Sequence, residues 1–146
     1  MTTIAWDGTV LAADTLVSAA SCNFHVTKIA RAGKYLLGAA GDFDAAMLMM
    51  EWFLHGAQRD DFPSELQKTE GNSCVLLVIV AGEVPEIRRY DIVHIPTIIK
   101  GKFYSVGSGS ASALAAMHCG KNAIEAVQIA HMFDCRTGDQ VETLTF

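Results

Sequence analysis

The stretch MTTIAWDGTVLAAD at residues 1–14 contains the strongest local fold signal in the chain. Its Asp-Gly pair separates two apolar runs and favours a tight hairpin turn, because both residue types tolerate positive φ. We therefore predict paired strands over residues 2–6 and 9–14. A two-residue turn would place Asp14 beside the start of the chain. The pairs expected across this hairpin are Trp6 with Thr9, Ile4 with Leu11 and Thr2 with Ala13.

The segment after this hairpin indicates a second hairpin followed by a helix. Strands are predicted over residues 26–31 and 34–40, joined at Ala32-Gly33. A helix is predicted over residues 42–58, because its apolar residues recur at the spacing of one buried helical face. These residues are Ala46, Met49, Met50, Phe53 and Ala57. Residues 59–72 are polar and read as a connector with at most a short helix.

The second half of the chain repeats this mixture of strands and helices. Strands are predicted over residues 74–81, 87–93, 102–106 and 141–146, and helices over residues 110–119 and 121–133. The order of strands, helix, strands, two helices and strand predicts an α+β layered fold with mainly antiparallel sheets. Since no linker or internal repeat is visible, we expect one domain over residues 1–146.

Composition excludes several classes of protein. The 146 residues are 51% hydrophobic and 18% charged, which suits a folded chain with a sizeable core. A net charge of -5, with no basic run longer than Arg88-Arg89, argues against nucleic acid and anionic membrane surfaces as partners. The four cysteines form no C-x-x-C pair, which fits a reduced cytoplasmic setting. The chain has no apolar run long enough to cross a bilayer and no signal-peptide pattern at its start.

Thr2 is the first candidate for chemistry. A terminal threonine can act as a nucleophile because its own α-amine can serve as the base. Thr2 needs only the removal of Met1, and a nearby cation would lower the pKa of its α-amine. Lys28, in the apolar-flanked VTKI at 26–29, is the candidate cation, and Asp14 is its candidate partner. A solvated lysine and a solvated aspartate remain the alternative, because charged residues are seldom fully buried.

Other motifs carry less chemistry. The backbone N–H of Gly41 could stabilise an oxyanion, although glycines at such turns often serve backbone geometry alone. The GSGS turn at 107–110 fits neither a phosphate loop nor G-x-S-x-G, so Ser110 is interpreted as a helix N-cap. The five histidines show no metal-ligand spacing, and we expect neither a metal nor a cofactor.

Five motifs in order resemble the proteasome β-type (HslV-like) family of N-terminal nucleophile (Ntn) hydrolases. They are TTI at 2–4 with VLAAD at 10–14, VTKI at 26–29, GAAG at 38–41 with DFDA at 42–45, VGSG at 106–109 and FDCRTGD at 133–139. The resemblance covers the chain from end to end. It implies a four-layer αββα sandwich of two mainly antiparallel sheets. The helical hairpin of the family would be shortened, because the connector after Gln58 cannot hold a second long helix.

The resemblance also implies catalytic roles. Thr2 would be the nucleophile and, through its amine, the base; Lys28 would tune that amine, and Asp14 would hold Lys28. Gly41 would supply the oxyanion N–H, in a segment one residue tighter than in the family.

Two further roles follow from the resemblance. Ser108, Asp134 and Thr137 would form a hydrogen-bonded support around the amine, with Thr137 standing where the family often has Ser. The backbone near Ser18 and Gly41 would pair with an extended peptide substrate.

Three functions remain open at this point. The first is a threonine peptidase that cleaves polypeptides inside a homo-oligomeric ring, with an ATP-dependent unfoldase as a partner class. The second is a catalytically silent assembly protein that retains Met1. The third is an amidohydrolase with a small-molecule amide substrate.

Overall fold

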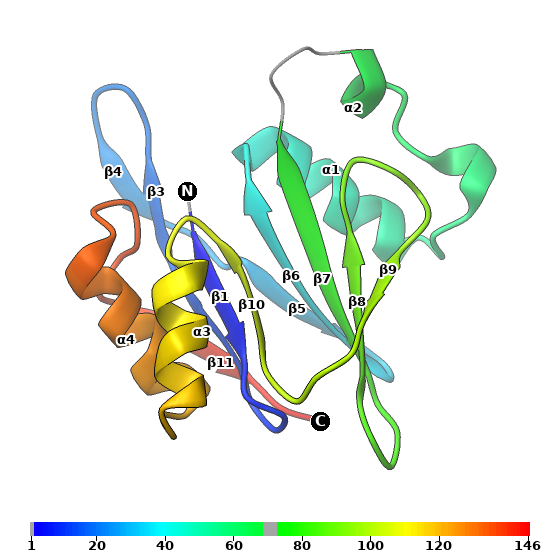
Figure 1. The fold of residues 1–146 in the computed structure, drawn as a ribbon. Coiled ribbons are helices and arrows are strands. Elements are labelled where there is room, and N and C mark those ends of the chain that lie inside the picture. Colours follow the sequence, from blue (N-terminus) through cyan, green and yellow to red (C-terminus); the bar gives the residue numbers. More distant parts are fainter. Residues whose placement is uncertain (1, 69–72) are drawn as a thin grey trace.

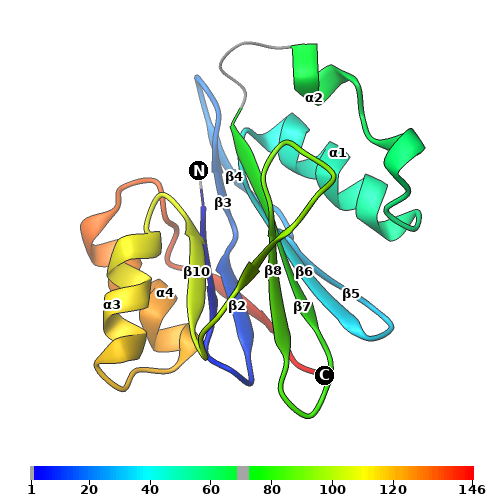
Figure 2. The same cartoon turned by 45° about the vertical axis from the view of Figure 1, so that its right-hand side comes forward.

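Two antiparallel sheets lie face to face in the computed structural model of the chain, and helices cover the outer face of each (Figure 1). The structure describes residues 2–68 and 73–146. The first sheet has the order β10-β1-β2-β11 and the second the order β5-β6-β7-β8-β9, while β3 and β4 form a separate hairpin. Figure 2 shows α3 and α4 outside the first sheet and α1 outside the second.

The strands of the first sheet are β1 (Thr3–Trp6), β2 (Leu11–Asp14), β10 (Tyr104–Gly107) and β11 (Val141–Leu144). Those of the second are β5 (Ile29–Ala32), β6 (Tyr35–Gly41), β7 (Cys74–Val80), β8 (Glu86–Tyr90) and β9 (Thr97–Ile99). The separate hairpin consists of β3 (Leu16–Ser18) and β4 (Asn23–His25). The helices are α1 (Phe43–Leu54), α2 (Glu65–Lys68), α3 (Ser110–His118) and α4 (Ala123–Phe133), with a 3-10 turn over Arg59–Asp61.

Three apolar cores separate the four layers, and the alternation of side chains along each strand builds them. In β1, Ile4 and Trp6 point between the sheets, whereas Ala5 packs with the residues of α3 and α4. In β6, Leu36 points between the sheets and Leu37 packs with α1. Because both faces of each sheet are covered, the central strands are apolar throughout rather than alternately polar and apolar.

The predicted register of the first hairpin is wrong by two residues. The structure pairs Trp6 with Leu11 and Ile4 with Ala13. The side chain of Asp7 explains the longer connection, because its Oδ1 accepts hydrogen bonds from the backbone N–H groups of Thr9 and Val10, at 2.9 and 2.8 Å. A shift of two residues leaves every side chain on its predicted face, so the layering is unaffected.

Smaller differences concern turns and helix ends. The second hairpin turns at Gly33-Lys34 rather than at Ala32-Gly33. Helix α1 ends at Leu54 instead of reaching residue 58, because Gly56 and Ala57 adopt positive φ angles of 105° and 53°. The N-cap of α3 is Gly109, so the interpretation of Ser110 as that cap is wrong. The short strands β3, β4 and β9 were not predicted.

The connector after α1 contains only the 3-10 turn and the single turn of α2 within its described part. Residues 69–72 of the predicted connector lie outside the described residues, as does Met1. Among the helices that the structure describes, none is both long and apolar enough to span a membrane.

Candidate active site

The candidate site is built around the first residues of the chain, which continue into the central strand β1 of the first sheet (Figure 1). Thr2 is only 5% exposed. Its carbonyl oxygen accepts a hydrogen bond of 2.8 Å from the Ser108 N–H, and the Thr3 N–H donates to Asp14 Oδ1 at 2.8 Å. The peptide unit between Thr2 and Thr3 is therefore fixed by the end of β2 on one edge and by the residue after β10 on the other.

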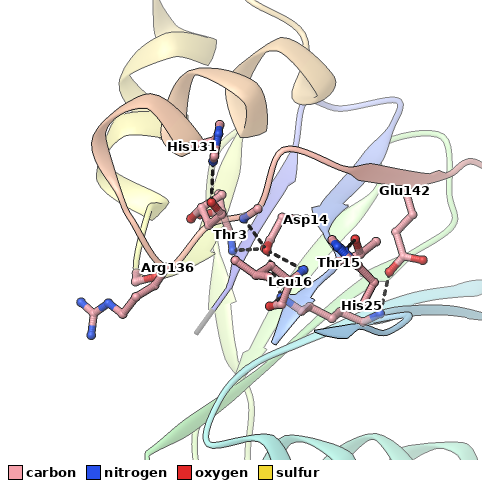
Figure 3. Close-up of polar contacts among 12 residues, drawn as sticks. Thr3, Asp14, Thr15, Leu16, His25, His131, Arg136 and Glu142 are labelled. Carbon is pink, nitrogen blue, oxygen red and sulfur yellow. Dashed lines mark hydrogen bonds and ion pairs between the residues drawn. The ribbon is translucent and has the colours of Figure 1, made fainter. Parts of the chain in front are cut away.

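Asp14, at the end of β2, is fully buried and accepts four hydrogen bonds (Figure 3). The donors are the backbone N–H groups of Thr3, Gly138 and Leu16, at 2.8, 2.9 and 3.1 Å, and Nζ of Lys28, at 3.1 Å. A buried carboxylate is costly unless its lone pairs are satisfied and its charge is paired. Both conditions are met here by three backbone N–H groups and the ammonium of Lys28.

Lys28 lies just before β5 and is 5% exposed. Its Nζ donates to Asp14 and to the carbonyl oxygen of Leu16, the latter at 2.5 Å. Its backbone N–H donates to Glu142 Oε1 on β11, at 2.6 Å (Figure 3). Burial lowers the pKa of the Lys28 ammonium below its ordinary value, although the Asp14 and Glu142 carboxylates oppose that shift. The alternative of two solvated charges is therefore excluded by the geometry.

A cavity brings Thr2, Lys28 and Gly41 together. The rest of its wall is mainly apolar and comes from β3, the segment before β5, β6 and α1. These residues are Val17, Thr27, Ala39, Ala40, Phe43, Ala46, Met47 and Met50. A side chain held in this cavity would lie beside Thr2 with apolar contacts on most sides.

The register of β6 places the N–H of Gly41 on the edge of the strand that faces β5. The N–H of Ala39 donates to the carbonyl of Lys28 at 3.2 Å, on the β5 side of β6. Successive N–H groups of a strand alternate between its two edges, so that of Gly41 lies on the same edge. The ladder between β5 and β6 ends at Ile29, which leaves the Gly41 N–H beyond the last pair.

Gly41 also meets a steric requirement that only glycine satisfies. Its φ is +116°, and a Cβ at this position would lie 2.1 Å from the carbonyl oxygen of Ser73. The next residue, Asp42, caps α1 by accepting a hydrogen bond from the Ala45 N–H at 3.0 Å. The glycine therefore lets the chain turn from strand into helix at the mouth of the cavity.

A second hydrogen-bonded group lies on the other side of β1. Ser108 Oγ and Thr137 Oγ1 both donate to Asp134 Oδ2, the latter at 2.8 Å. Thr3 Oγ1 joins the group at 2.6 Å from Thr137 Oγ1. Burial opposes ionisation of Asp134, but the hydrogen bonds from Ser108 and Thr137 outweigh it and lower its pKa below 3.8. Asp134 is therefore an ionised acceptor at neutral pH.

The structure brings seven of the eight predicted site residues together around the start of β1 and leaves one apart. Ser18 is exposed at the end of β3, and its neighbour Val17, not Ser18 itself, lines the cavity. Thr3, Glu142 and Gly138 were missed, although each bonds to a predicted residue. Their partners are 11, 114 and 124 positions away along the chain, so local spacing does not reveal these bonds, although Thr3 and Gly138 lie within the TTI and FDCRTGD motifs. Among the described residues, none of the His, Cys, Asp and Glu clusters could hold a metal ion.

Comparison with known proteins identifies the fold. Neither the protein-family models nor the curated proteins gave a match to this sequence. Among solved structures, eukaryotic HslV from Trypanosoma brucei is similar with a TM-score of 0.70 and 20% identity, over 99% of each chain. Thiobacillus denitrificans BPH in complex with epoxomicin is similar with the same TM-score and identity, over 99% of this chain and 97% of that one. The predicted αββα sandwich is thus confirmed, and the chain has the Ntn-hydrolase fold that it shares with HslV.

Proposed function

We propose that this chain is an N-terminal threonine peptidase that cleaves peptide bonds in polypeptide substrates. The observation that carries the proposal is the placement of Thr2 in one cavity with Lys28, whose ammonium is fixed by the fully buried Asp14. A buried ion pair beside a terminal hydroxyl is expensive to maintain and contributes little net stability compared with an apolar replacement. A role in chemistry explains its presence better than a role in folding does.

The first step of the proposed mechanism is activation of Thr2. Once Met1 is removed, the α-amine of Thr2 lies in a region where the positive charge of Lys28 disfavours a second cation. The pKa of the amine is lowered by that charge, so a larger fraction is neutral and able to accept a proton at neutral pH. Ser108 and Asp134, through the backbone bond from Ser108 to Thr2, hold the residue in place.

Acyl transfer follows. As Oγ of Thr2 bonds to the substrate carbonyl carbon, the hydroxyl proton moves to the α-amine, and the N–H of Gly41 stabilises the developing oxyanion. The amine gives this proton to the substrate nitrogen as the C–N bond breaks, which leaves an ester on Thr2. Water, deprotonated by the same amine, then attacks the ester and releases the carboxylic acid with Thr2 restored.

The proposed substrate is an extended peptide that lies along the cavity mouth. The strand end at Gly41 and the neighbourhood of Ser18 on β3 offer backbone groups for β-type pairing on either side of Thr2. The apolar wall, which includes Met47 and Met50, favours an apolar side chain on the residue that supplies the acyl group. A small-molecule amide would use only part of this surface, and hydrolysis of peptides of several lengths separates the two substrate classes.

We further propose a homo-oligomeric ring in the cytoplasm, with an ATP-dependent unfoldase as a partner class. Support comes from three exposed apolar side chains of α1, Phe43, Met47 and Leu54, which are 40, 44 and 48% exposed, the first two at the edge of the cavity. Large apolar side chains gathered on one helix face are typical of surfaces covered by another subunit. Light scattering after size-exclusion chromatography measures the subunit number.

The experiment that tests the proposal uses a chain that begins at Thr2, verified by intact mass. We expect turnover of peptide substrates and one mass adduct with epoxomicin, the inhibitor bound in the BPH structure. Thr2→Ala should abolish both, whereas Thr2→Ser, which keeps a hydroxyl, should retain adduct formation. Retention of Met1 in all native material, or undiminished turnover by Thr2→Ala, would refute the peptidase and leave the silent assembly protein.

A further inference from the structure

A second cavity lies next to the first, across the backbone of Ala40 and Gly41. Both residues line both cavities, and the second is also lined by Gly107 and Ser108 at the end of β10. The N–H of Ser108 bonds to the carbonyl of Thr2, so one residue of this cavity wall is hydrogen-bonded to the backbone of the candidate nucleophile. Further lining residues are Ser73, Cys74, Val75, Arg89 and Asp91. The mechanism proposed above assigns no role to this cavity.

Arg89 is the unusual residue in this cavity. It stands opposite Leu77 in the ladder between β7 and β8, and directly opposed residues share one face of a sheet. Leu77 is fully buried between the two sheets, as is Ile87 two positions before Arg89. A guanidinium thus occupies an inward position at the edge of an apolar layer, and it is 37% exposed there.

The guanidinium of Arg89 is held in a fixed orientation. Its Nε and Nη2 donate to Asp91 Oδ1, at 3.2 and 2.8 Å, and its Nη1 donates to the hydroxyl of Tyr104 on the opposite sheet, at 3.1 Å. The hydrogen bonds to Asp91 and Tyr104 raise the pKa of Arg89 further, so it stays charged. A guanidinium has five N–H groups, and these contacts use three. One N–H on each Nη has no partner in the part of the chain that the structure describes.

We propose that this cavity binds the leaving segment of the substrate and that Arg89 donates to a carboxylate on that segment. The inference rests on the proposed peptidase function. A peptide that places its acyl residue in the apolar cavity continues past Thr2 on the opposite side of Gly41, where the second cavity begins. Two N–H groups on neighbouring nitrogens match the two oxygens of a carboxylate. Asp91 offsets part of the charge, so the preference for an acidic group is modest.

The test compares substrates that differ only after the scissile bond. Internally quenched peptides with amidated C-termini carry Glu or Gln at the first or second position of the leaving segment, and kcat/KM is measured with the chain that begins at Thr2. We expect Glu to be preferred over Gln roughly fivefold at one of the two positions, as for a half-exposed charge-assisted hydrogen bond. A further peptide ends at that position with Gln and a free C-terminal carboxylate. Its kcat/KM shows whether a terminal carboxylate can replace the carboxylate of a Glu side chain.

Variants link the preference to Arg89. Arg89→Gln should reduce the Glu-to-Gln ratio to about one, and Arg89→Lys, which keeps the charge without the fork, should retain part of it. Arg88→Gln is the matched control, because Arg88 lies on the same strand opposite Val78 and therefore faces the α1 side. The Arg88 variant should keep the ratio of the parent protein. Melting temperatures of all variants exclude a loss of folding as the cause.

Failure of this inference is distinguishable from failure of the proposed function. An aminocoumarin amide has an acyl part but no leaving peptide segment. If the parent protein hydrolyses neither the amide nor the peptides, the peptidase proposal fails and the inference fails with it. If it hydrolyses the amide and cleaves the Glu and Gln peptides at equal rates, only the assignment of Arg89 is overturned. A ratio that survives in Arg89→Gln has the same consequence.

Discussion

Replacing Asp14 by Asn tests the ion pair beneath the candidate site. The Asp14 carboxylate accepts four hydrogen bonds, one on Oδ1 and three on Oδ2. An amide has only one oxygen, so its NH2 group must face either the N–H of Thr3 or the three donors around Oδ2. In both orientations donors face donors, and the buried ammonium of Lys28 loses its counter-charge.

The expected loss of stability is large. Removal of one partner from a buried ion pair costs about 3–5 kcal/mol of the free energy of unfolding. For a chain of this size each kcal/mol lowers the melting temperature by about 2–4 °C, so Asp14→Asn should melt about 6–20 °C lower. Urea denaturation followed by tryptophan fluorescence measures the same difference as a free energy. The exposed Asp139 supplies the control, and Asp139→Asn should change stability by less than about 0.5 kcal/mol.

Lys28→Met extends the same experiment. Methionine keeps an unbranched side chain but removes the charge. Three backbone N–H groups still donate to Asp14, so the loss of unfolding free energy should be smaller for Lys28→Met than for Asp14→Asn. The double variant should lose less stability than the sum of the two single losses. Each substitution removes the charge that the other substitution would leave buried and unpaired. If the free energy of unfolding of Asp14→Asn lay within about 1 kcal/mol of that of the parent, it would refute the reasoning. A loss that small is what a solvent-exposed ion pair gives.

Three other changes have defined outcomes. Gly41→Ala should lower the free energy of unfolding by more than about 2 kcal/mol, because the added Cβ would lie 2.1 Å from the Ser73 carbonyl oxygen. Gly33→Ala is the control: no atom lies within 4 Å of its added Cβ, so it should lower the free energy of unfolding by only about 1 kcal/mol. Urea denaturation measures both differences. The lowered pKa of Asp134 stabilises the fold above pH 3.8, so the stability difference between the parent and Asp134→Asn should shrink as pH falls through the folded pKa; a difference that is constant with pH contradicts this. Burial raises the pKa of Cys74 to about 11, so alkylation of the native protein at pH 8 should modify the three exposed cysteines and spare Cys74, as counted by intact mass.

The layered fold could be predicted because its signals are local. Apolar runs such as residues 74–81 and the helical spacing in residues 42–58 identify elements that are buried on one or both faces. The proximity of Asp14 to the chain start also came from a local turn. The exact register of this hairpin could not be predicted. The choice between two and four connecting residues depends on how the Asp7 carboxylate bonds to the backbone.

The parts that sequence did not predict depend on distant contacts. Strands β3 and β4 are three residues long and largely exposed, so neither alternation nor an apolar run marks them. Thr3 carries its hydroxyl toward Thr137 only because β1 lies beside the segment after α4. The inward position of Arg89 follows from its pairing with Leu77, which a reading of the isolated strand could not supply.

The central position of β1 has a consequence for biosynthesis. Its two neighbours are β2, which is synthesised next, and β10, which begins about a hundred residues later. The second neighbour of β2 is β11, which follows β10 in the sequence. Such long-range pairing makes closure of the first sheet a late and slow event. A partly translated polypeptide on the ribosome therefore lacks the framework around Thr2 until β10 and β11 have been synthesised.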